Sequence, residues 1–93
     1  MAGNIYVVRN RVNDKCYVGQ TIHPVEKRLR EHSHNKKSLL GRAIRKYGIN
    51  NFAIATFENI REEWIDWAEQ EMIINKKSLV PNGYNIHAGV QGS

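Results

Sequence analysis

The chain has 93 residues, of which 41% are hydrophobic and 25% are charged, a composition typical of a single compact domain. Its apolar runs reach only four or five residues, whereas crossing a bilayer takes roughly 20, so we expect no membrane insertion. The sequence shows no hydrophobic signal region, and Cys16 is the only cysteine, which together favour a reducing cytoplasm over secretion.

Charge is unevenly distributed along the chain, whose net charge is +5. Eight of the 14 Lys and Arg residues lie between Lys27 and Lys46, where Glu31 is the only acid, and six of the nine acids lie between Glu58 and Glu71. This separation predicts a basic surface suited to a polyanion, although a solvated helix face would give the same pattern. The side chains that we expect to contact the phosphates of such a polyanion are Lys27, Arg30, Lys36, Lys37, Arg42, Arg45 and Lys46.

The chain is expected to begin with a β-hairpin. Two β-prone runs, residues 4–9 and 15–20, are separated by turn-forming Asn and Asp residues. Pairing Arg9 with Asp14 would place Tyr6 directly opposite Tyr17, with both tyrosines on one face of the sheet. The residues expected on the other face are Ile5, Val7, Cys16 and Val18.

Two helices are expected after the hairpin. Thr21 is a candidate cap, and Pro24 lies near the first turn of a helix. One face of this helix follows a spacing of i, i+3, i+4 and i+7 at Val25, Arg28, Leu29 and His32. Ser38 is a candidate cap for a second helix, which Gly48 would end. The apolar stripe of the second helix consists of Leu40, Ala43, Ile44 and Tyr47, with Arg42, Arg45 and Lys46 on its opposite side.

The remaining elements complete an α+β order of ββααβα. Residues 52–57 have the composition of a third strand, and residues 60 to about 76 are expected to form a third helix. Residues 81–85 have the composition of a turn, and Gly89 and Gly92 are typical of a linker. We therefore expect one domain over residues 1–88 and the start of a Gly-rich linker or tail over 89–93.

Several polar residues stand beside apolar positions in the expected helices. Arg28 and His32 lie one turn apart and can point toward a shared pocket beside the sheet, although a surface Arg and a half-buried His would give the same pattern. Glu69 falls in register with the apolar residues Ile65, Ala68, Met72 and Ile73. A carboxylate on such a face needs a cation or hydrogen-bond donors. Glu71 lies on a different stripe, with Trp64, Trp67 and Ile74, and periodicity alone leaves both glutamates open.

Several spaced motifs together resemble the GIY-YIG nuclease family, whose name is the consensus of its two hairpin strands. They are Asn4-Ile5-Tyr6, Tyr17-Val18-Gly19, the Arg28-x-x-x-His32 step, Tyr47-Gly48 followed by Phe52, a glutamate in the third helix, and Asn82-Gly83-Tyr84-Asn85. The resemblance covers nearly the whole chain in order. Asn4 replaces the first glycine of the motif and Val18 replaces isoleucine, and neither change removes a reacting group. The family implies a three-stranded antiparallel sheet flanked by helices.

The resemblance also implies roles for individual residues. Tyr6 would activate the attacking water as a general base, and Tyr17 would position that water or the scissile phosphate. Arg28 would stabilise the charge of the transition state, and His32 would orient or assist the tyrosines. Because an ordinary tyrosine, with a pKa near 10, is a poor base at neutral pH, its neighbours must favour the ionised form or relay the proton.

The resemblance further implies a single divalent cation, Mg²⁺ or Mn²⁺, held by Glu69, with Glu71 as the alternative ligand. Asn85 would fix the network by hydrogen bonds. Mg²⁺ keeps most of its waters and needs only one or two protein carboxylates, so one glutamate suffices as its anchor. We choose Glu69 because its face of the helix and its spacing to Asn85 both agree with the family pattern.

The expected activity is metal-dependent hydrolysis of DNA phosphodiester bonds, as in the catalytic module of a homing endonuclease. Such a module would act in the cytoplasm of a bacterium or of the host of a phage or mobile element. It would depend on a further DNA-binding domain or partner for specificity. The alternatives are a fragment of a restriction-type nuclease and a catalytically silent nucleic-acid-binding module.

Overall fold

The structure is a computed structural model that describes residues 2–87, so the linker expected at 89–93 lies outside the described residues. Its elements are β1 (Gly3–Asn10), β2 (Cys16–Thr21), α1 (Val25–His34), α2 (Leu39–Tyr47), the short 3₁₀ turn η1 (Ile49–Asn51), β3 (Phe52–Ile60) and α3 (Glu62–Lys76). The strands form one antiparallel sheet in the order β2-β1-β3. The expected α+β fold with the order ββααβα is confirmed.

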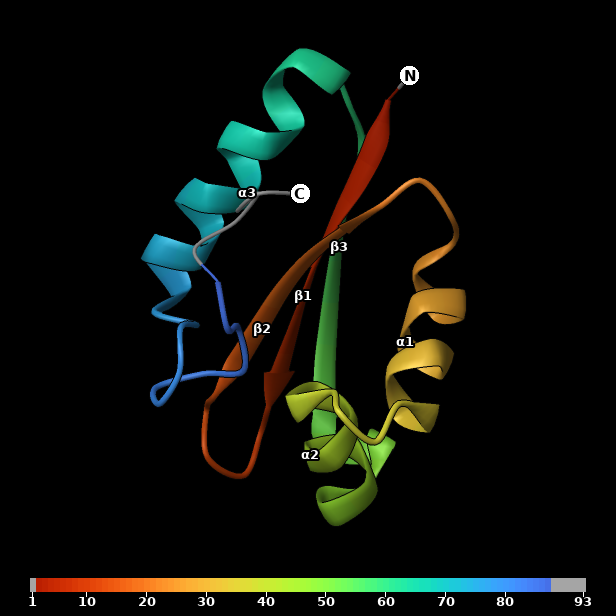
Figure 1. Cartoon of the computed structure of the whole chain (residues 1–93), viewed down its shortest axis with the longest axis vertical. Coiled ribbons are helices and arrows are strands. Elements are labelled where there is room, and N and C mark those ends of the chain that lie inside the picture. Colours follow the sequence, from red (N-terminus) through yellow and green to blue (C-terminus); the bar gives the residue numbers. More distant parts are fainter. Residues whose placement is uncertain (1, 88–93) are drawn as a thin grey trace.

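The sheet is the middle of three layers (Figure 1). Helix α3 covers one face, and α1 and α2 cover the other, so two separate cores form. The core under α1 and α2 contains Tyr6, Val8, Val25, Leu40, Ala43, Ile44 and Phe52. The core under α3 contains Ile5, Val7, Cys16, Val18, Ile65 and Ile73. The alternation predicted for the hairpin is therefore confirmed, because both tyrosines lie on the α1–α2 side.

The hairpin register differs from the predicted one by two residues. Tyr6 pairs with Gly19 and Arg9 pairs with Cys16, so Tyr6 and Tyr17 are diagonal neighbours and do not face each other directly. Asn10 donates its backbone N–H to the Lys15 carbonyl oxygen, 2.9 Å away, so the turn spans residues 11–14. A shift of two residues keeps every side chain on its face, so Tyr6 and Tyr17 still share one face as predicted.

Three element boundaries also differ from expectation. Thr21 does not cap α1, because its hydroxyl accepts a hydrogen bond from the His23 backbone N–H (3.0 Å) and the cap residue is Pro24. Strand β3 continues past Phe57 to Ile60, where the start of β1 still offers a partner. Helix α3 accordingly begins two residues later than predicted.

The connection between α1 and α2 fixes the position of the end of α1. Ser38 caps α2 by accepting a hydrogen bond from the Gly41 backbone N–H (2.9 Å), as predicted, and Gly48 ends the helix at a φ of 85°. Gly41 lies directly against the carbonyl oxygen of His32, where a Cβ atom would collide with backbone. The two helices can approach this closely only because residue 41 is glycine.

The segment after α3 returns along the outer edge of β2. The Tyr84 backbone N–H donates to the Cys16 carbonyl oxygen at 2.9 Å. The Asn85 side chain then accepts from the Val18 N–H and donates to the Val18 carbonyl oxygen, both at 2.8 Å. Its amide thus occupies the place of a neighbouring strand, which protects an edge that would otherwise expose unpaired backbone groups.

Candidate active site

The two hairpin tyrosines lie together on the α1–α2 side of the sheet. Their ring centroids are 6.0 Å apart, and Tyr6 is fully buried at 0% exposure whereas Tyr17 is half-buried. Burial raises the pKa of Tyr6. The neighbouring Tyr17 raises this pKa further, whereas the positive charge of Arg28 lowers it. Burial also raises the pKa of Tyr17, although the hydrogen bond from Tyr6 opposes the rise. Both hydroxyls are therefore protonated at neutral pH in the free protein.

Gly19 creates the space that these tyrosines occupy. A Cβ atom at this position would lie 2.5 Å from Cζ and 2.6 Å from the hydroxyl oxygen of Tyr6, and 2.9 Å from Cε2 of Tyr17. The last residue of the YVG strand motif is therefore glycine for a steric reason, because any side chain would displace both rings.

His32 connects Tyr6 to the loop between α1 and α2. Its Nε2 lies 3.3 Å from the Tyr6 hydroxyl and its Nδ1 lies 2.8 Å from the Ser38 hydroxyl, while its ring packs edge-on against Tyr17 at a centroid distance of 5.0 Å. Burial lowers the pKa of His32, and the positive charge of Arg28 lowers it further. His32 is thus neutral at neutral pH and can accept a proton.

The lowered pKa of His32 predicts that the fold loses stability in mild acid. Between the folded-state pKa and 6.5 the unfolded chain binds a proton that the folded chain does not, so stability falls as pH is lowered through this window. Urea unfolding at about pH 7 and about pH 5.5 should show a smaller pH dependence for His32→Gln than for the native chain. His34→Gln, at an exposed position of α1, is the matched control, and equal pH dependence in all three proteins would contradict the prediction.

Arg28 lies at the margin of this group. Its Nη1 donates to Oε1 of Glu31 at 2.6 Å, one turn along α1, and its charge acts on the Tyr6 hydroxyl. The Arg28 side chain keeps 35% of its surface exposed. Arg28 can therefore contact both a buried tyrosine and an anion approaching from solvent.

Glu69 reaches the site from the other side of the sheet. It is buried, at 8% exposure, whereas Glu71 is exposed on another face of α3. Gln20 donates from Nε2 to Glu69 Oε1 at 2.9 Å and to Asp66 Oδ1 at 3.0 Å. Burial raises the pKa of Glu69. The hydrogen bond from Gln20 lowers this pKa, and the negative charge of Asp66 raises it further. A half-satisfied buried carboxylate of this kind is suited to a cation.

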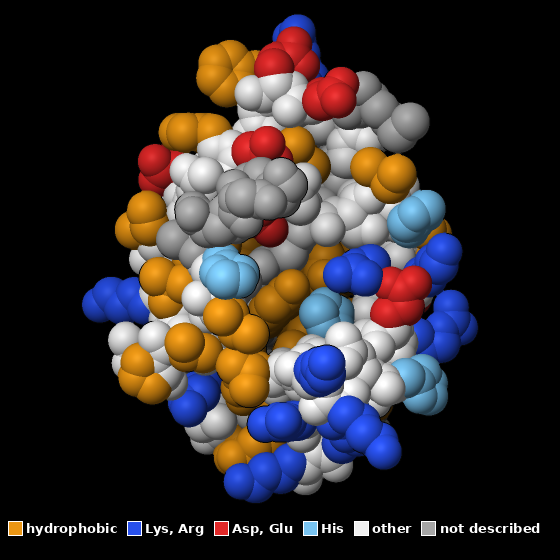
Figure 2. Space-filling view, in the orientation of Figure 1, with side chains coloured by type: hydrophobic (Ala, Val, Ile, Leu, Met, Phe, Trp, Pro, Cys, Tyr) orange, Lys and Arg blue, Asp and Glu red, His pale blue; other side chains and the backbone are white. Residues whose placement is uncertain are grey.

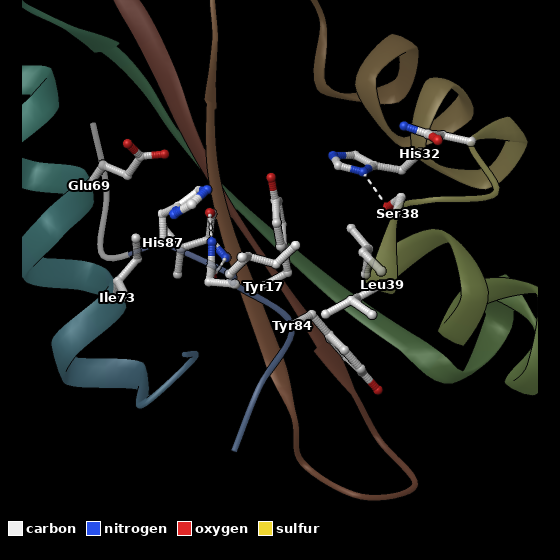
Figure 3. A pocket seen from close by; sticks show the side chains of 13 residues that line it. Tyr17, His32, Ser38, Leu39, Glu69, Ile73, Tyr84 and His87 are labelled. Atoms are coloured by element: carbon white, nitrogen blue, oxygen red, sulfur yellow. Dashed lines mark hydrogen bonds between the residues drawn. The ribbon is translucent and has the colours of Figure 1, made fainter. Parts of the chain in front are cut away.

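A cleft of about 290 Å³ joins these groups across the edge of β2. Figure 3 shows Glu69 on one side and His32 with Ser38 on the other, with Tyr17 between them. The residues that carry polar groups into the cleft include Tyr17, His32, Ser38, Glu69, Asn85 and His87. Tyr6 and Arg28 do not line the cleft. The Tyr6 hydroxyl contacts it through His32, and the positive charge of Arg28 acts on Tyr17 and His32.

Sequence reasoning missed three contributors to the site. Gln20 orients the Glu69 carboxylate, the Ser38 hydroxyl holds the His32 ring in addition to capping α2, and His87 lines the cleft. Gln20 follows directly after the YVG motif in β2, and this position is the feature of the sequence that could have identified it as a site residue. The second role of Ser38 depends on the crossing of α1 and α2, which no local pattern reveals.

The basic residues predicted to contact phosphates lie on α1, α2 and the loop between these helices. Figure 2 shows Lys and Arg side chains gathered over α1 and α2, with acids concentrated toward the start of α3. All seven predicted phosphate contacts are exposed. Two of them also brace the connection between the helices, since Arg42 donates to the Lys36 carbonyl oxygen (3.1 Å) and Arg45 to that of Ser33 (2.6 Å).

Comparison with known protein families decides the assignment. The family model described as the GIY-YIG catalytic domain matches residues 2–85. The chain belongs to the GIY-YIG family. The family name comes from the two strand motifs that here carry Tyr6 and Tyr17, and the domain is a nuclease module.

Two solved structures resemble this GIY-YIG domain closely. One is a glutamate-to-alanine variant of the catalytic domain of the intron endonuclease I-TevI, which is 31% identical, with a TM-score of 0.74 over 97% of this chain and 98% of the other. The second is the catalytic domain of the homing endonuclease I-TevI, 30% identical with a TM-score of 0.68 over 91% and 98% of the two chains. A search of curated proteins finds no match. The likeness to an endonuclease domain therefore extends over the whole fold.

Two further features of this GIY-YIG domain concern membrane-spanning helices and clusters of metal-binding side chains. Within residues 2–87, no helix has the length and apolar character needed to span a membrane. No three His, Cys, Asp or Glu side chains of the described part gather into a metal-binding cluster.

Proposed function

We propose that the chain is the catalytic module of a divalent-metal-dependent endonuclease that hydrolyses DNA phosphodiester bonds, as in homing endonucleases. The observation that carries this proposal is the buried carboxylate of Glu69, which faces the same cleft as Tyr17 and His32. A module that only binds phosphate needs positive charge and gains nothing from a buried acid beside it. Acid, tyrosine and imidazole together suit hydrolysis.

The site fits one ion, Mg²⁺ or Mn²⁺, held by Glu69. Gln20 engages one carboxylate oxygen, Oε1, and within residues 2–87 the other oxygen has no hydrogen-bond partner. The raised pKa of Glu69 reflects the burial of its carboxylate, a cost that the Gln20 hydrogen bond partly offsets and that a bound cation would offset further. The exposed Glu71 has no such need. The ion would supply positive charge for the phosphate and for the departing oxygen.

Within the proposal, the tyrosines act as a unit that activates water. Tyr17 faces the cleft, so it meets the attacking water or the scissile phosphate. Tyr6 lies behind it and, together with His32, completes a route by which a proton leaves the water through the hydroxyls toward Nε2 of His32. The water oxygen then bonds to phosphorus as the bond to the leaving sugar oxygen breaks. Arg28, beside Tyr6, stabilises the additional negative charge.

The substrate contact extends from the cleft over the surface of α1 and α2. The exposed Lys and Arg side chains of these helices are placed to bind successive phosphates of a DNA strand. Phosphate contacts fix position without selecting sequence, so the module acts with a separate DNA-binding domain or partner that supplies specificity.

The test is nicking of supercoiled plasmid with Mg²⁺ or Mn²⁺. We expect cleavage that EDTA stops, and a loss of roughly 10²- to 10⁴-fold in Tyr17→Phe, because the hydroxyl that meets the water is removed. Tyr47→Phe is the matched control, since Tyr47 is a half-buried tyrosine of α2 outside the cleft, and it should cut like the native chain. Binding of plasmid without cleavage in either metal would favour the alternative, a silent nucleic-acid-binding module.

A further inference from the structure

The cleft contains an imidazole that the proposed function does not use. His87 follows Asn85 by two residues, and it lines the same cleft as Glu69 and Tyr17. In Figure 3 the His87 ring lies between the Glu69 carboxylate and Tyr17. The strand and helix motifs that mark the site give no reason for a histidine here, so its position needs its own explanation.

The backbone that carries His87 is anchored at two points. The Asn85 side chain holds the Val18 backbone by two hydrogen bonds of 2.8 Å, and the Asn85 carbonyl oxygen accepts from the Val80 N–H, also at 2.8 Å. These bonds fix the chain immediately before His87 against β2. The imidazole is thus brought to the cleft by ordered structure, even though the side chain itself is exposed.

The other histidines do not offer a ring nitrogen to a ligand in the cleft. Both ring nitrogens of His32 are engaged, by the hydroxyls of Tyr6 and Ser38. His23 and His34 are exposed and do not line the cleft. Within residues 2–87, neither ring nitrogen of His87 has a hydrogen-bond partner. His87 is therefore the histidine of the cleft whose nitrogens are available to a ligand.

We propose that His87 is the second protein ligand, beside Glu69, of the divalent ion in the cleft, an inference that rests on the proposed function. A neutral imidazole nitrogen binds Mn²⁺ and the later transition metals far better than it binds Mg²⁺ or Ca²⁺, which prefer oxygen. A His–Glu pair with the remaining positions filled by water makes the site selective for Mn²⁺. With Glu69 alone, the site would have no such preference.

The experiment measures metal binding without DNA and without turnover. Mn²⁺ affinity is measured from the electron paramagnetic resonance signal of free Mn²⁺, and Mg²⁺ affinity by its competition with Mn²⁺, for the native chain, His87→Ala, Glu69→Gln and His34→Ala. We expect His87→Ala to bind Mn²⁺ about tenfold more weakly with little change for Mg²⁺, so that selectivity falls by the same factor. His34→Ala, an exposed histidine outside the cleft, should match the native chain. In the native chain, substoichiometric Mn²⁺ should broaden the ring proton resonances of His87 first.

The outcomes separate this inference from the function on which it rests. Mn²⁺ binding that depends on both Glu69 and His87 supports it. Binding that Glu69→Gln abolishes but His87→Ala leaves unchanged overturns the His87 assignment and leaves the metal-dependent nuclease intact. Absence of any Glu69-dependent binding overturns both. Because His87 is exposed, its replacement should leave the circular dichroism spectrum and the unfolding midpoint unchanged.

Discussion

Replacing Glu69 with Gln is expected to slow cleavage greatly and, at the same time, to make the fold more stable at neutral pH. The carboxylate is buried, and burial raises its pKa, which means that the folded state disfavours the charge. Glutamine keeps the shape and still accepts the Gln20 hydrogen bond, but it removes the charge that would hold the ion. Loss of the metal should reduce the cleavage rate roughly a thousandfold.

Glu71→Gln is the control for this prediction. Glu71 lies two residues away in α3 but is exposed, so its neutralisation should change neither property appreciably. Plasmid nicking and urea unfolding at pH 7 give both readouts from the same preparations. The sign of the stability change also follows from linkage, since protonation of Glu69 in acid adds a stabilising contribution to the native chain that Glu69→Gln lacks. A rate loss in Glu71→Gln with none in Glu69→Gln would reverse the assignment.

The second large effect is expected for Gly19→Ala. The added methyl group would meet the Tyr6 ring at 2.5 Å, and Tyr6 cannot move away because it is fully buried. Both tyrosines must shift, and a displacement of about 1 Å in a reacting group costs roughly a hundredfold in rate. Overpacking should also lower the free energy of unfolding by about 1–3 kcal/mol.

Gly48→Ala separates the loss of activity from the loss of stability. Gly48 has a φ of 85°, so alanine there is strained by about 1–3 kcal/mol, but the space around its Cβ is open and the Cβ would meet no atom of Tyr6 or Tyr17. The two variants should thus be destabilised to a similar extent, while only Gly19→Ala loses cleavage per folded molecule. Nicking rates corrected by the folded fraction from urea unfolding decide the question. Equal corrected rates would show that Gly19 has no steric role in the site.

Much of the fold follows from local patterns in the sequence. The Asn- and Asp-rich turn, the Ser38 cap and the Gly48 end all lie where their chemistry places them, and the ββααβα order is confirmed. The hairpin register could not be derived, because several residues can close the turn and the choice depends on pairing over the full length of both strands. The extension of β3 to Ile60 depends on where β1 begins, a contact between residues far apart in the chain.

The site was less accessible to prediction than the fold. Periodicity could not separate Glu69 from Glu71, because α3 has apolar residues on more than one face, including the exposed Trp64 and Trp67. Only the packing of α3 on β2 shows which glutamate is buried. The burial of Tyr6 behind Tyr17 was equally hidden, since both tyrosines occupy similar strand positions and differ only in what covers them.

The docking of Asn85 against β2 has a consequence for synthesis of the chain. During translation, Tyr17 and the rest of β2 leave the ribosome long before residue 85 does. Until then, the backbone of Val18 at the outer edge of β2 lacks its partner Asn85. Most of the fold can form during this interval, but the cleft lacks one wall and β2 lacks its cap. The cleft is therefore completed by one of the last steps of translation of the domain, and a chain interrupted before that step would lack it.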